Sequence, residues 1–386
     1  MSAAALGSSP AARVPELTRL VLVGSVIADL MMTVPALPDR GGDILAGAAR
    51  AQAGGGFNVL AAAARLGLRG ALLGHVGTGA LGSMVGAALA AEGVVELLPR
   101  VSSADTGLCV GFIEPDAERT FVTSVGCEAE VGLAELRSSP VGVSDAVYVS
   151  GYDLCYPVTG PAVAEWLSGL SSVPFVVVDP GPLAASIPRE VLDGVLRHTS
   201  VLTLNAREVR LLGGSAPALL ARLRAGGSVL ERDGARGCTV WWGGPGGAVR
   251  SEHVGAPSVA AVDSTGAGDA HTGAFLAALS WVPDGGGAGG LVGAGGLVGA
   301  GGLVGAGGLV GAGGLVGAGG LVGAVRGAAG GAVGAGGLVG AGGLVGAVRV
   351  ANAAAAYAVT QVGSATGPTR PELEAFVASA GDGISD

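Results

Sequence analysis

Lysine is absent from this sequence, so every fixed positive charge belongs to an arginine. The absence excludes the phosphate-loop lysine of Walker-type nucleotide-binding proteins, the strand lysine of protein kinases and catalysis through a lysine Schiff base. A phosphotransferase with this composition must use backbone N–H groups, arginine side chains and metal ions instead. We attribute the missing lysine to a genome rich in guanine and cytosine, which also favours Ala, Gly, Val and Arg, rather than to function.

Cysteine, histidine and aromatic residues are scarce as well. The cysteines form no C-x-x-C pair and no histidine cluster accompanies them, so neither a zinc site nor a disulfide framework is expected, and a cytoplasmic location is predicted. The cysteines are Cys109, Cys127, Cys155 and Cys238, and the scattered histidines, interpreted as structural, are His75, His198, His253 and His271. A net charge of −9 argues against general binding to nucleic acid, whose phosphates attract basic surfaces.

The segment Asp263–Asp269 reads Asp-Ser-Thr-Gly-Ala-Gly-Asp and carries most of the functional information. It follows an apolar run at Val259–Val262, expected to be a β-strand, and opens a run of small residues at Ala270–Leu279, expected to be a helix. Small residues at a helix N-terminus leave backbone N–H groups uncovered, and such a nest attracts anions. Asp269 either takes a proton from a hydroxyl while the nest holds a phosphoryl group, or it simply caps the helix.

A second glycine turn stands earlier in the chain. Residues 53–67 read Ala-Gly-Gly-Gly-Phe-Asn-Val-Leu-Ala-Ala-Ala-Ala-Arg-Leu-Gly, a turn that enters an alanine-rich helix with Asn58 near its start. Together the two segments closely resemble the two signatures of the PfkB, or ribokinase-like, family of carbohydrate kinases. This resemblance implies an α/β fold, a three-layer α/β/α arrangement around a mostly parallel sheet with a small β-sheet lid.

Further segments resemble the same family, over roughly residues 18–283 and 343–378. They are Leu202–Glu208 with an Asn-x-x-Glu motif, the turn Asp233–Gly237, and Ala351–Ala355 in the last core helix. Three shorter stretches, at 40–44, 114–121 and 150–152, resemble a poorly characterised bacterial sugar-kinase branch. The coverage of the chain by these landmarks strengthens the interpretation of the two glycine turns.

The order of apolar segments agrees with this fold. Leu20–Ala28 is predicted to form the first buried strand and the turn that ends it, which would place Asp29 beyond a strand end, where ligands gather in α/β sheets. Strand-like and helix-like segments then alternate, which predicts a parallel sheet covered by helices on both faces. These segments are Leu81–Glu92, Ala146–Val149, Pro161–Leu170, Phe175–Val178, Arg189–Arg197, Val201–Leu204, Glu208–Leu212 and Pro217–Arg224.

Residues 285–347 differ from the rest of the chain. The hexapeptide Gly-Gly-Leu-Val-Gly-Ala recurs in near-perfect tandem over residues 289–324 and again over 336–347. Because Gly343–Arg349 enters the expected helix of Asn352, the simplest origin is duplication of the first turns of that helix. Glycine destabilises a helix by about 1 kcal/mol per position relative to alanine. We therefore predict a flexible insertion, with a small β element or a membrane or partner contact as alternatives.

The expected organisation follows from these boundaries. A chain of 386 residues with 49% hydrophobic content can bury a substantial core. The N-terminus has no long apolar run and does not resemble a secretory signal. The expected segments are a flexible N-terminus at 1–17, a kinase domain at 18–378 with lid segments at about 30–52 and 105–125, the insertion at 285–347, and a C-terminal tail at 379–386.

The resemblance implies phosphoryl transfer from ATP to an alcohol group of a sugar. Asp269 would be the base, and the backbone of Gly266, Ala267 and Gly268 would form the anion hole. On the acceptor side, the resemblance implies Asp29, Gly55 and Asn58 as binding residues. Asp43 and Arg119 lie in the expected lid and are candidates for further polar contacts. The exposed edges of the lid strands favour a homodimer.

The resemblance also implies a nucleotide side, formed by Asn205, Glu208, Gly234, Gly237 and Asn352. Glu208 would order Mg²⁺ through water, since magnesium keeps part of its hydration shell. Activation by a monovalent cation is common in the family, and Asp263 and Thr265 are candidate ligands for K⁺. Without the other motifs, Asn205 and Glu208 would read as an ordinary helix cap.

The acceptor and some alternatives stay open. Family members often have one more residue, frequently lysine, inside the turn between the glycines and the asparagine. This chain is shorter there and has Phe57 directly before Asn58, so the resemblance does not imply ribose specificity. A nucleoside kinase of the same fold is an alternative, with Phe57, Phe112 and Phe121 as the candidates for stacking on a base. A non-enzymatic interaction protein that uses the glycine repeat is a distant third. A dinucleotide oxidoreductase is excluded because no Gly-x-Gly-x-x-Gly turn follows the first strand.

Overall fold

Buried, mostly β-branched and leucine-rich strands form the centre of the protein, for which the computed structural model describes residues 17–116, 118–172, 174–281 and 341–381. Within these residues the main sheet has the order β13-β12-β11-β10-β9-β8-β1-β4-β5. Neighbouring strands from β11 to β5 are parallel, while β12 and β13 are antiparallel additions at one edge. The strands are β1 (Arg19–Val23), β4 (Arg69–Leu73), β5 (Val95–Glu96), β8 (Asp145–Ser150), β9 (Phe175–Asp179), β10 (Val201–Asn205), β11 (Ser228–Arg232), β12 (Cys238–Gly243) and β13 (Val249–Val254).

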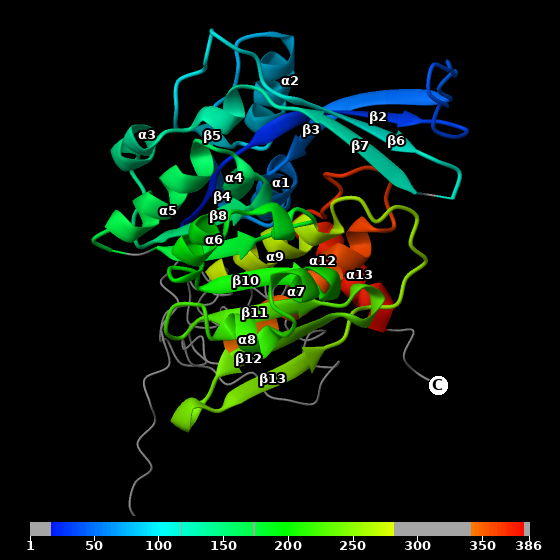
Figure 1. Ribbon diagram of the computed structural model, residues 1–386. Coiled ribbons are helices and arrows are strands. Elements are labelled where there is room, and N and C mark those ends of the chain that lie inside the picture. Colours follow the sequence, from blue (N-terminus) through cyan, green and yellow to red (C-terminus); the bar gives the residue numbers. More distant parts are fainter. Residues whose placement is uncertain (1–16, 117, 173, 282–340, 382–386) are drawn as a thin grey trace, which may run out of the picture.

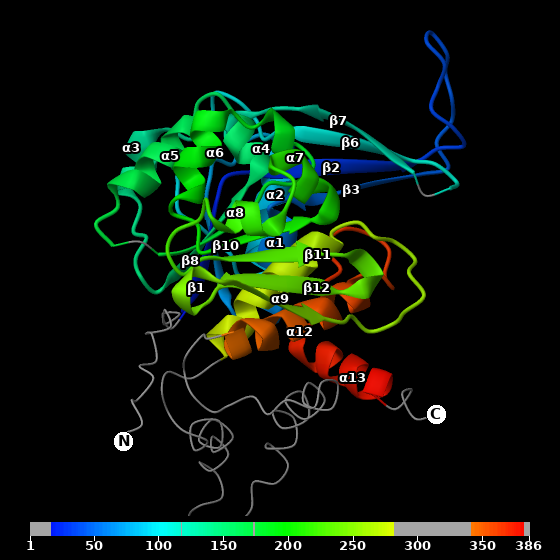
Figure 2. The same ribbon diagram turned by 60° about the horizontal axis from the view of Figure 1, so that its bottom comes forward.

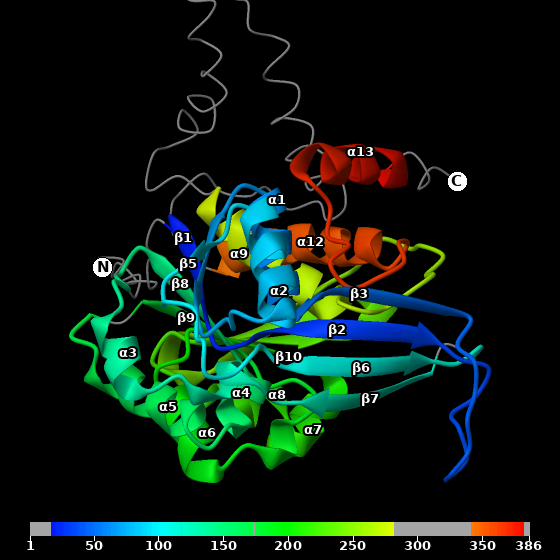
Figure 3. The same cartoon turned by 90° about the horizontal axis from the view of Figure 1, so that it is seen from above.

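Helices cover both faces of this sheet, as the view from above shows (Figure 3). One layer contains α1 (Phe57–Arg65), α2 (Ala80–Ala91), α9 (Ala267–Ser280), α12 (Ala341–Ala358) and α13 (Arg370–Gly381). The other contains α3 (Leu133–Ser138), α4 (Gly151–Cys155), α5 (Thr159–Gly169), α6 (Arg189–Leu196), α7 (Ala206–Leu212) and α8 (Ala216–Leu220). Short 3₁₀ turns lie at Cys127–Glu130, Ala184–Ser186, Gly234–Arg236 and Pro245–Gly247. The predicted three-layer α/β/α fold is confirmed.

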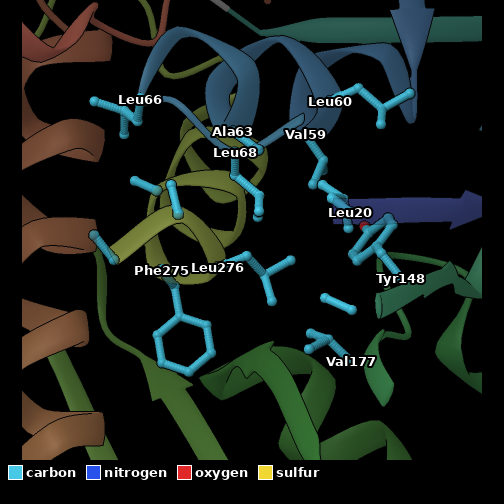
Figure 4. Close-up of a cluster of buried hydrophobic side chains, with 14 of the residues drawn as sticks. Leu20, Val59, Leu60, Ala63, Leu66, Leu68, Tyr148, Val177, Phe275 and Leu276 are labelled. Atoms are coloured by element: carbon cyan, nitrogen blue, oxygen red, sulfur yellow. The ribbon is translucent and has the colours of Figure 1, made fainter. Parts of the chain in front are cut away.

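The two faces of each central strand supply two separate cores, because successive side chains of a strand point in opposite directions. Leu20 and Leu22 of β1 belong to the core beneath α1 and α9, whereas Val21 and Val23 belong to the core on the opposite face. Figure 4 shows the first core, with Phe275 of α9 among its fully buried side chains. Continuous apolar strands of this kind are typical of parallel sheets covered on both sides.

A smaller sheet projects beyond the carboxyl ends of the main strands (Figure 1). Its strands are β2 (Val26–Thr33), β3 (Ala48–Gly55), β6 (Leu108–Ile113) and β7 (Arg119–Ser124), in the order β3-β2-β6-β7 within the described residues. Only β2 and β6 run parallel in it. The strands predicted for the lid are therefore present as a separate sheet.

The start of the chain differs from its predicted form. Leu20–Ala28 is not one strand and a turn, because β1 ends at Val23 and β2 already begins at Val26. Gly24 makes this break possible: its φ of 141° favours glycine, and a Cβ atom there would lie 2.1 Å from Cγ of Asp153. Asp29 consequently belongs to a lid strand rather than to a loop beyond the main sheet.

Two further predicted elements need correction. The apolar run Val259–Val262 is not a strand: it is irregular, Val262 is exposed, and the backbone N–H of Val262 donates to the carbonyl of Val359 instead of a strand partner. The predicted helix Pro217–Arg224 ends at Leu220. Both errors came from apolar composition, which does not reveal whether a partner strand or a continuing helix is available.

The predicted insertion lies outside the described residues except for its last part. Helix α12 begins at Ala341, and Leu344, Val345 and Val348 are buried in the core shared with α9. The final copy of the repeat thus forms packed turns of a core helix, in agreement with an origin by duplication of those turns. Within the described residues, no helix combines the length and hydropathy needed to cross a bilayer.

Candidate active site

Polar residues end four neighbouring strands of the main sheet at the side that faces the lid. They are Ser150 of β8, Asp179 of β9, Asn205 of β10 and Arg232 of β11. The parallel registers place Ser150 beside Asp179 and Asn205 beside Arg232. Ligands of α/β sheets bind at the carboxyl ends of strands, so this row forms the floor of a candidate site.

The N-terminus of α9 forms one wall of the site. Gly266 has a φ of 72°, and a Cβ atom there would come within 2.1 Å of the carbonyl oxygen of Ser364, so only glycine fits. The N–H of Ala267 donates to the carbonyl of Ser264 at 3.3 Å. Among the described residues, the N–H groups of Gly266 and Gly268 have no protein acceptor. These N–H groups, called the nest below, lie at the positive end of the helix dipole, where a bound anion would be stabilised.

Asp269 lies in the first turn of α9 and contacts the second glycine turn. Nδ2 of Asn58, at the start of α1, donates a hydrogen bond to Oδ2 of Asp269 at 3.0 Å. Burial raises the pKa of Asp269 to about 6, while the hydrogen bond from Asn58 and the charge of Arg232 oppose this shift and the charge of Asp179 adds to it. The structure therefore brings the two predicted signatures into direct contact around a carboxylate whose pKa suits a base near neutral pH.

Asp29, in β2, is a second, partly buried carboxylate, close enough to Asp269 for their charges to interact. Burial raises its pKa to about 7, and the negative charge of Asp269 adds to the shift. The side chain lies over Gly54, where a Cβ atom would come within 1.9 Å of Oδ2 of Asp29. Gly55 has a φ of 61°, and a Cβ atom there would meet Ser25 and Ile27 rather than Asp29. The sequence argument identified Gly55 but missed the closer approach at Gly54.

Asn205 and Glu208 form a capping box at the start of α7. Oδ1 of Asn205 accepts from the N–H of Glu208 at 3.0 Å, and Oε2 of Glu208 accepts from the N–H of Asn205 at 2.8 Å. Oε1 of Glu208 also accepts from Nδ2 of Asn205. Burial raises the pKa of Glu208, and the charge of Asp179 raises it further. The simple reading of this pair as a helix cap is therefore correct for its geometry.

The other residues predicted on the nucleotide side lie around β11, β12 and α12. Gly234 and Gly237 bracket the turn between β11 and β12, with φ values of 55° and 105°. Nδ2 of Asn352 donates to the carbonyl of Val254 at 2.8 Å and to that of Gly255 at 3.2 Å. Asn352 therefore ties α12 to the end of β13.

Arg119 and Asp263 connect the lid to the segment before α9. Nη2 of Arg119, in β7, forms an ion pair with Oδ1 of Asp263 at 2.5 Å. Oδ1 of Asp263 also accepts from the N–H and the hydroxyl of Thr265, and its Oδ2 accepts from the N–H of Gly363 at 3.0 Å. Burial would raise the pKa of Asp263, but these hydrogen bonds and the charge of Arg119 leave it lowered.

Asp43 is not brought to this group. It is exposed in the connection between β2 and β3, beyond Thr33 and therefore at the far end of β2 from Gly55. The carboxylate of Asp43 is exposed to solvent, like its neighbours in this loop. Of the predicted lid contacts, only Arg119 meets the segment that carries the nest.

Sequence reasoning missed a buried ionic cluster below the nest. Nη1 of Arg232 lies 2.9 Å from Oδ2 of Asp179, and its Nη2 lies 3.6 Å from Oε2 of Glu208. Nη1 of Arg232 also donates to the carbonyl of Gly268 at 3.3 Å. The signal that was available is positional: Asp179 and Arg232 each follow an apolar strand run and end it with a charge.

Two more side chains near the site were not predicted as site residues: Tyr152, and His271, which was interpreted as structural. Burial raises the pKa of Tyr152, in α4, and the charges of its neighbours, including Asp269 and Asp29, raise it further. Burial lowers the pKa of His271 to about 3, which keeps the ring neutral. In the described part of the chain, no cluster of three or more His, Cys, Asp or Glu side chains has the arrangement of a metal site.

Comparisons with known proteins agree with this geometry. Residues 17–286 match the sequence pattern of the pfkB family of carbohydrate kinases. YegV of Escherichia coli K12, named an uncharacterised sugar kinase, is 30% identical over 289 residues, which cover 69% of this chain and 84% of that protein. A ribokinase of Haemophilus influenzae is 28% identical over 269 residues, which cover 67% of this chain and 85% of the relative.

Solved structures share the fold. A ribokinase from Thermotoga maritima has a TM-score of 0.65 at 19% identity, over 94% of this chain and 100% of that one. The ribokinase of Arabidopsis thaliana, solved with ribose and ATP, has a TM-score of 0.62 at 19% identity, over 94% and 99% of the two chains. A nucleoside kinase from Methanocaldococcus jannaschii reaches 0.61 at 17% identity, over 95% and 99%. At these identities the likeness is one of fold.

Proposed function

Because this chain belongs to the pfkB family of carbohydrate kinases, we propose that it transfers the γ-phosphoryl group of ATP to a hydroxyl group of a small sugar, with Asp269 as the base. The observation that carries the proposal is the contact at 3.0 Å between Asn58 and Asp269, beside the nest that Gly266 and Gly268 form. A base and an anion-binding site at one helix end are what phosphoryl transfer to an alcohol requires.

The acceptor would bind between the lid and the start of α1. Oδ1 of Asn58 is buried and accepts no hydrogen bond within the described residues, so a sugar hydroxyl can donate to it. The carboxylate of Asp29 can accept from a neighbouring hydroxyl, and Gly55 leaves room for the ring. Asp43 is exposed, so we leave it out of the acceptor site.

The chemical step would depend on positioning and charge rather than on covalent intermediates. Nδ2 of Asn58 holds the carboxylate of Asp269 ionised and oriented toward the acceptor hydroxyl. Asp269 accepts the hydroxyl proton as the acceptor oxygen bonds to phosphorus. The N–H groups of Gly266, Ala267 and Gly268 face the phosphoryl oxygens, with Ala267 exchanging its weak contact to Ser264 for the anion.

The nucleotide would bind over β10, β11 and the turn that joins β11 to β12. Gly234 and Gly237 let the backbone of that turn approach a phosphate or ribose, and Asn352 fixes the adjoining wall. Both oxygens of Glu208 accept hydrogen bonds from Asn205, so Glu208 would hold Mg²⁺ only through bound water. Magnesium, when bound, supplies neutralisation of phosphate charge.

The carboxylate of Asp263, predicted as a ligand of K⁺, already has several donors around it. The guanidinium of Arg119 and the donors of Thr265 and Gly363 already engage both oxygens of its carboxylate. We therefore assign no step to K⁺ and propose instead that Arg119 joins the lid to the nest segment.

A nucleoside acceptor is the second candidate. It is favoured by Tyr152, a 44% exposed aromatic side chain close enough to Asp29 and Asp269 for their charges to act on it. Phe57 is buried in the core, Phe112 is half-buried in β6 and Phe121 is exposed on the edge strand β7, so we add Tyr152 to the candidates for stacking.

A panel assay tests both readings. Purified protein is incubated with ATP and Mg²⁺ and with single pentoses, hexoses, sugar acids or nucleosides, and ADP release is coupled to product detection by mass spectrometry. We expect turnover with a sugar that disappears in the Asp269→Asn variant. Turnover with nucleosides alone would select the second candidate, and equal turnover by the variant would refute the role of Asp269.

A further inference from the structure

Arg232 carries an inference that rests on the proposed function but names a new catalytic residue. We propose that its guanidinium binds the transferring phosphoryl group, and that Asp179 and Glu208 hold it in place until the nucleotide arrives. The site then contains a side-chain cation although the chain has no lysine. Arginine suits this task because its planar fork binds two phosphate oxygens at once.

The first support is position. Nη1 of Arg232 is 3.3 Å from the carbonyl oxygen of Gly268, one of the nest residues. A Cβ atom on Gly268 would lie 2.9 Å from the same nitrogen, so the glycine allows the guanidinium to lie directly against the nest. An anion bound to the N–H groups of the nest would be within reach of Arg232.

The second support is the cost of the cluster. The side chains of Arg232, Asp179 and Glu208 are only 14%, 9% and 6% exposed, and the contact between Arg232 and Glu208 is long, at 3.6 Å. Buried ion pairs often stabilise a fold less than apolar residues of the same size would. A charged cluster of this kind at the floor of a site therefore points to binding or catalysis.

The third support is charge balance. One guanidinium faces two carboxylates, and Asp269 lies close enough for its pKa to respond to Arg232. The described cluster thus has a negative excess, which favours a ligand that brings a cation with it, such as a nucleotide bound to Mg²⁺. The phosphate oxygens of that complex would then compete with Asp179 and Glu208 for the guanidinium as charged, bidentate acceptors.

The simple alternative is that Arg232 only joins the ends of β9 and β11. A set of variants separates the two roles: Arg232→Gln, Arg232→Lys and the double variant Asp179→Asn with Arg232→Gln. The matched control is Arg19→Gln, because Arg19 pairs with a buried aspartate at the opposite ends of the strands. Each variant is assayed for kcat, for KM of the acceptor and for melting temperature.

We expect Arg232→Gln to lower kcat by about 10²- to 10³-fold, as removal of one donor to a transition-state oxyanion does. KM for the acceptor should change little, and Arg232→Lys should recover part of kcat. The double variant should regain the melting temperature lost through the unpaired Asp179 but should not regain kcat. Arg19→Gln should lower the melting temperature and leave kcat unchanged.

Calorimetry with ATP, ADP and AMP supplies a readout that needs no acceptor. Arg232→Gln should weaken ATP binding more than AMP binding. The proposal would be overturned if the variant bound each nucleotide as tightly as the wild type does. Recovery of kcat in the double variant would overturn it as well. If the wild type phosphorylates no acceptor at all, the proposed function fails, and the nucleotide affinities still decide the role of Arg232.

Discussion

The two ends of the main sheet differ in how their buried charged side chains are paired. At the amino ends of β1 and β8, Arg19 binds Asp145 through two hydrogen bonds of 2.9 Å and donates a third to the carbonyl of Pro140. Asp145 also accepts from the N–H of Gly142. Charge and hydrogen-bonding capacity are matched there, partly in contact with solvent.

At the carboxyl ends of the strands the charges are not matched. Asp29 and Asp269 have raised pKa values, and one arginine, Arg232, serves Asp179 and Glu208 together. Aspartate and arginine therefore stabilise the fold at the amino ends of the strands. At the lid-facing side, the ionised forms of Asp29 and Asp269 are disfavoured by their surroundings. This difference supports the proposed function, because ionisable groups with shifted pKa values gather at sites that bind ligands.

Replacing one aspartate at each end of the sheet should give the largest difference in activity and stability between two variants. Asp269→Asn should reduce kcat by about 10³- to 10⁴-fold, because the proposed base is lost, and should raise the melting temperature by removing a buried charge. Asp145→Asn should leave kcat within about twofold and destabilise the fold by about 1 to 3 kcal/mol, because Arg19 loses its partner. Steady-state kinetics and thermal melts measure both. Loss of stability in Asp269→Asn would contradict the comparison.

The pH dependence should differ between activity and stability. The folded-state pKa values of about 6 for Asp269 and about 7 for Asp29 exceed the unfolded value near 4, so the folded protein binds these protons more tightly. The contribution of both groups to stability therefore rises as pH falls from about 7 toward 4, whereas kcat should fall about tenfold by about pH 5.

Asn58→Leu sharpens this test. The variant removes the hydrogen bond that favours the ionised Asp269, so the acid limb of the kcat profile should move to higher pH. Asp179, Arg232 and Asp29 also act on this titration, and the variant leaves all three in place. An unchanged acid limb would show that another group controls it.

A smaller effect is expected from the contact between the lid and the nest segment. Arg119→Gln should raise KM for the acceptor by about three- to tenfold, because a partly buried ion pair of this kind contributes about 1 kcal/mol. The exposed pair of Arg137 and Glu165 provides the control, and Arg137→Gln should alter neither KM nor kcat. A fall in kcat with constant KM would assign Arg119 to the chemistry instead.

The smallest effect should follow from shortening the repeat. Helix α9 runs from the nest to Trp281, whose indole N–H donates to the carbonyl of Leu66 and whose ring lines a cavity with Leu17 and Thr18 just before β1. The chain therefore leaves α9 at the amino end of the sheet, as Figure 2 also shows. Deletion of residues 289–324 should keep kcat within about twofold. A large loss would tie the repeat to the site.

Much of the site was predictable because its parts are local. Glycines with positive φ mark the turns at Gly55 and Gly266, and the helices after them follow from runs of small residues. Asp269 and Asn58 were therefore found as parts of two short signatures. Gly54 and Asp29 show the limit: their contact depends on the pairing of β2 with β3, which no short segment encodes.

Sequence patterns predicted most of the alternating strands and helices and the two glycine turns, because these depend on a few consecutive residues, but they gave a wrong end for the first strand and a strand at Val259–Val262 that is absent. The contacts of Arg232 with Asp179 and Glu208, and of Arg119 with Asp263, depend on the tertiary fold. Those pairs join distant segments, and the order of strands in the sheet, set by the packing of both cores, brings them together.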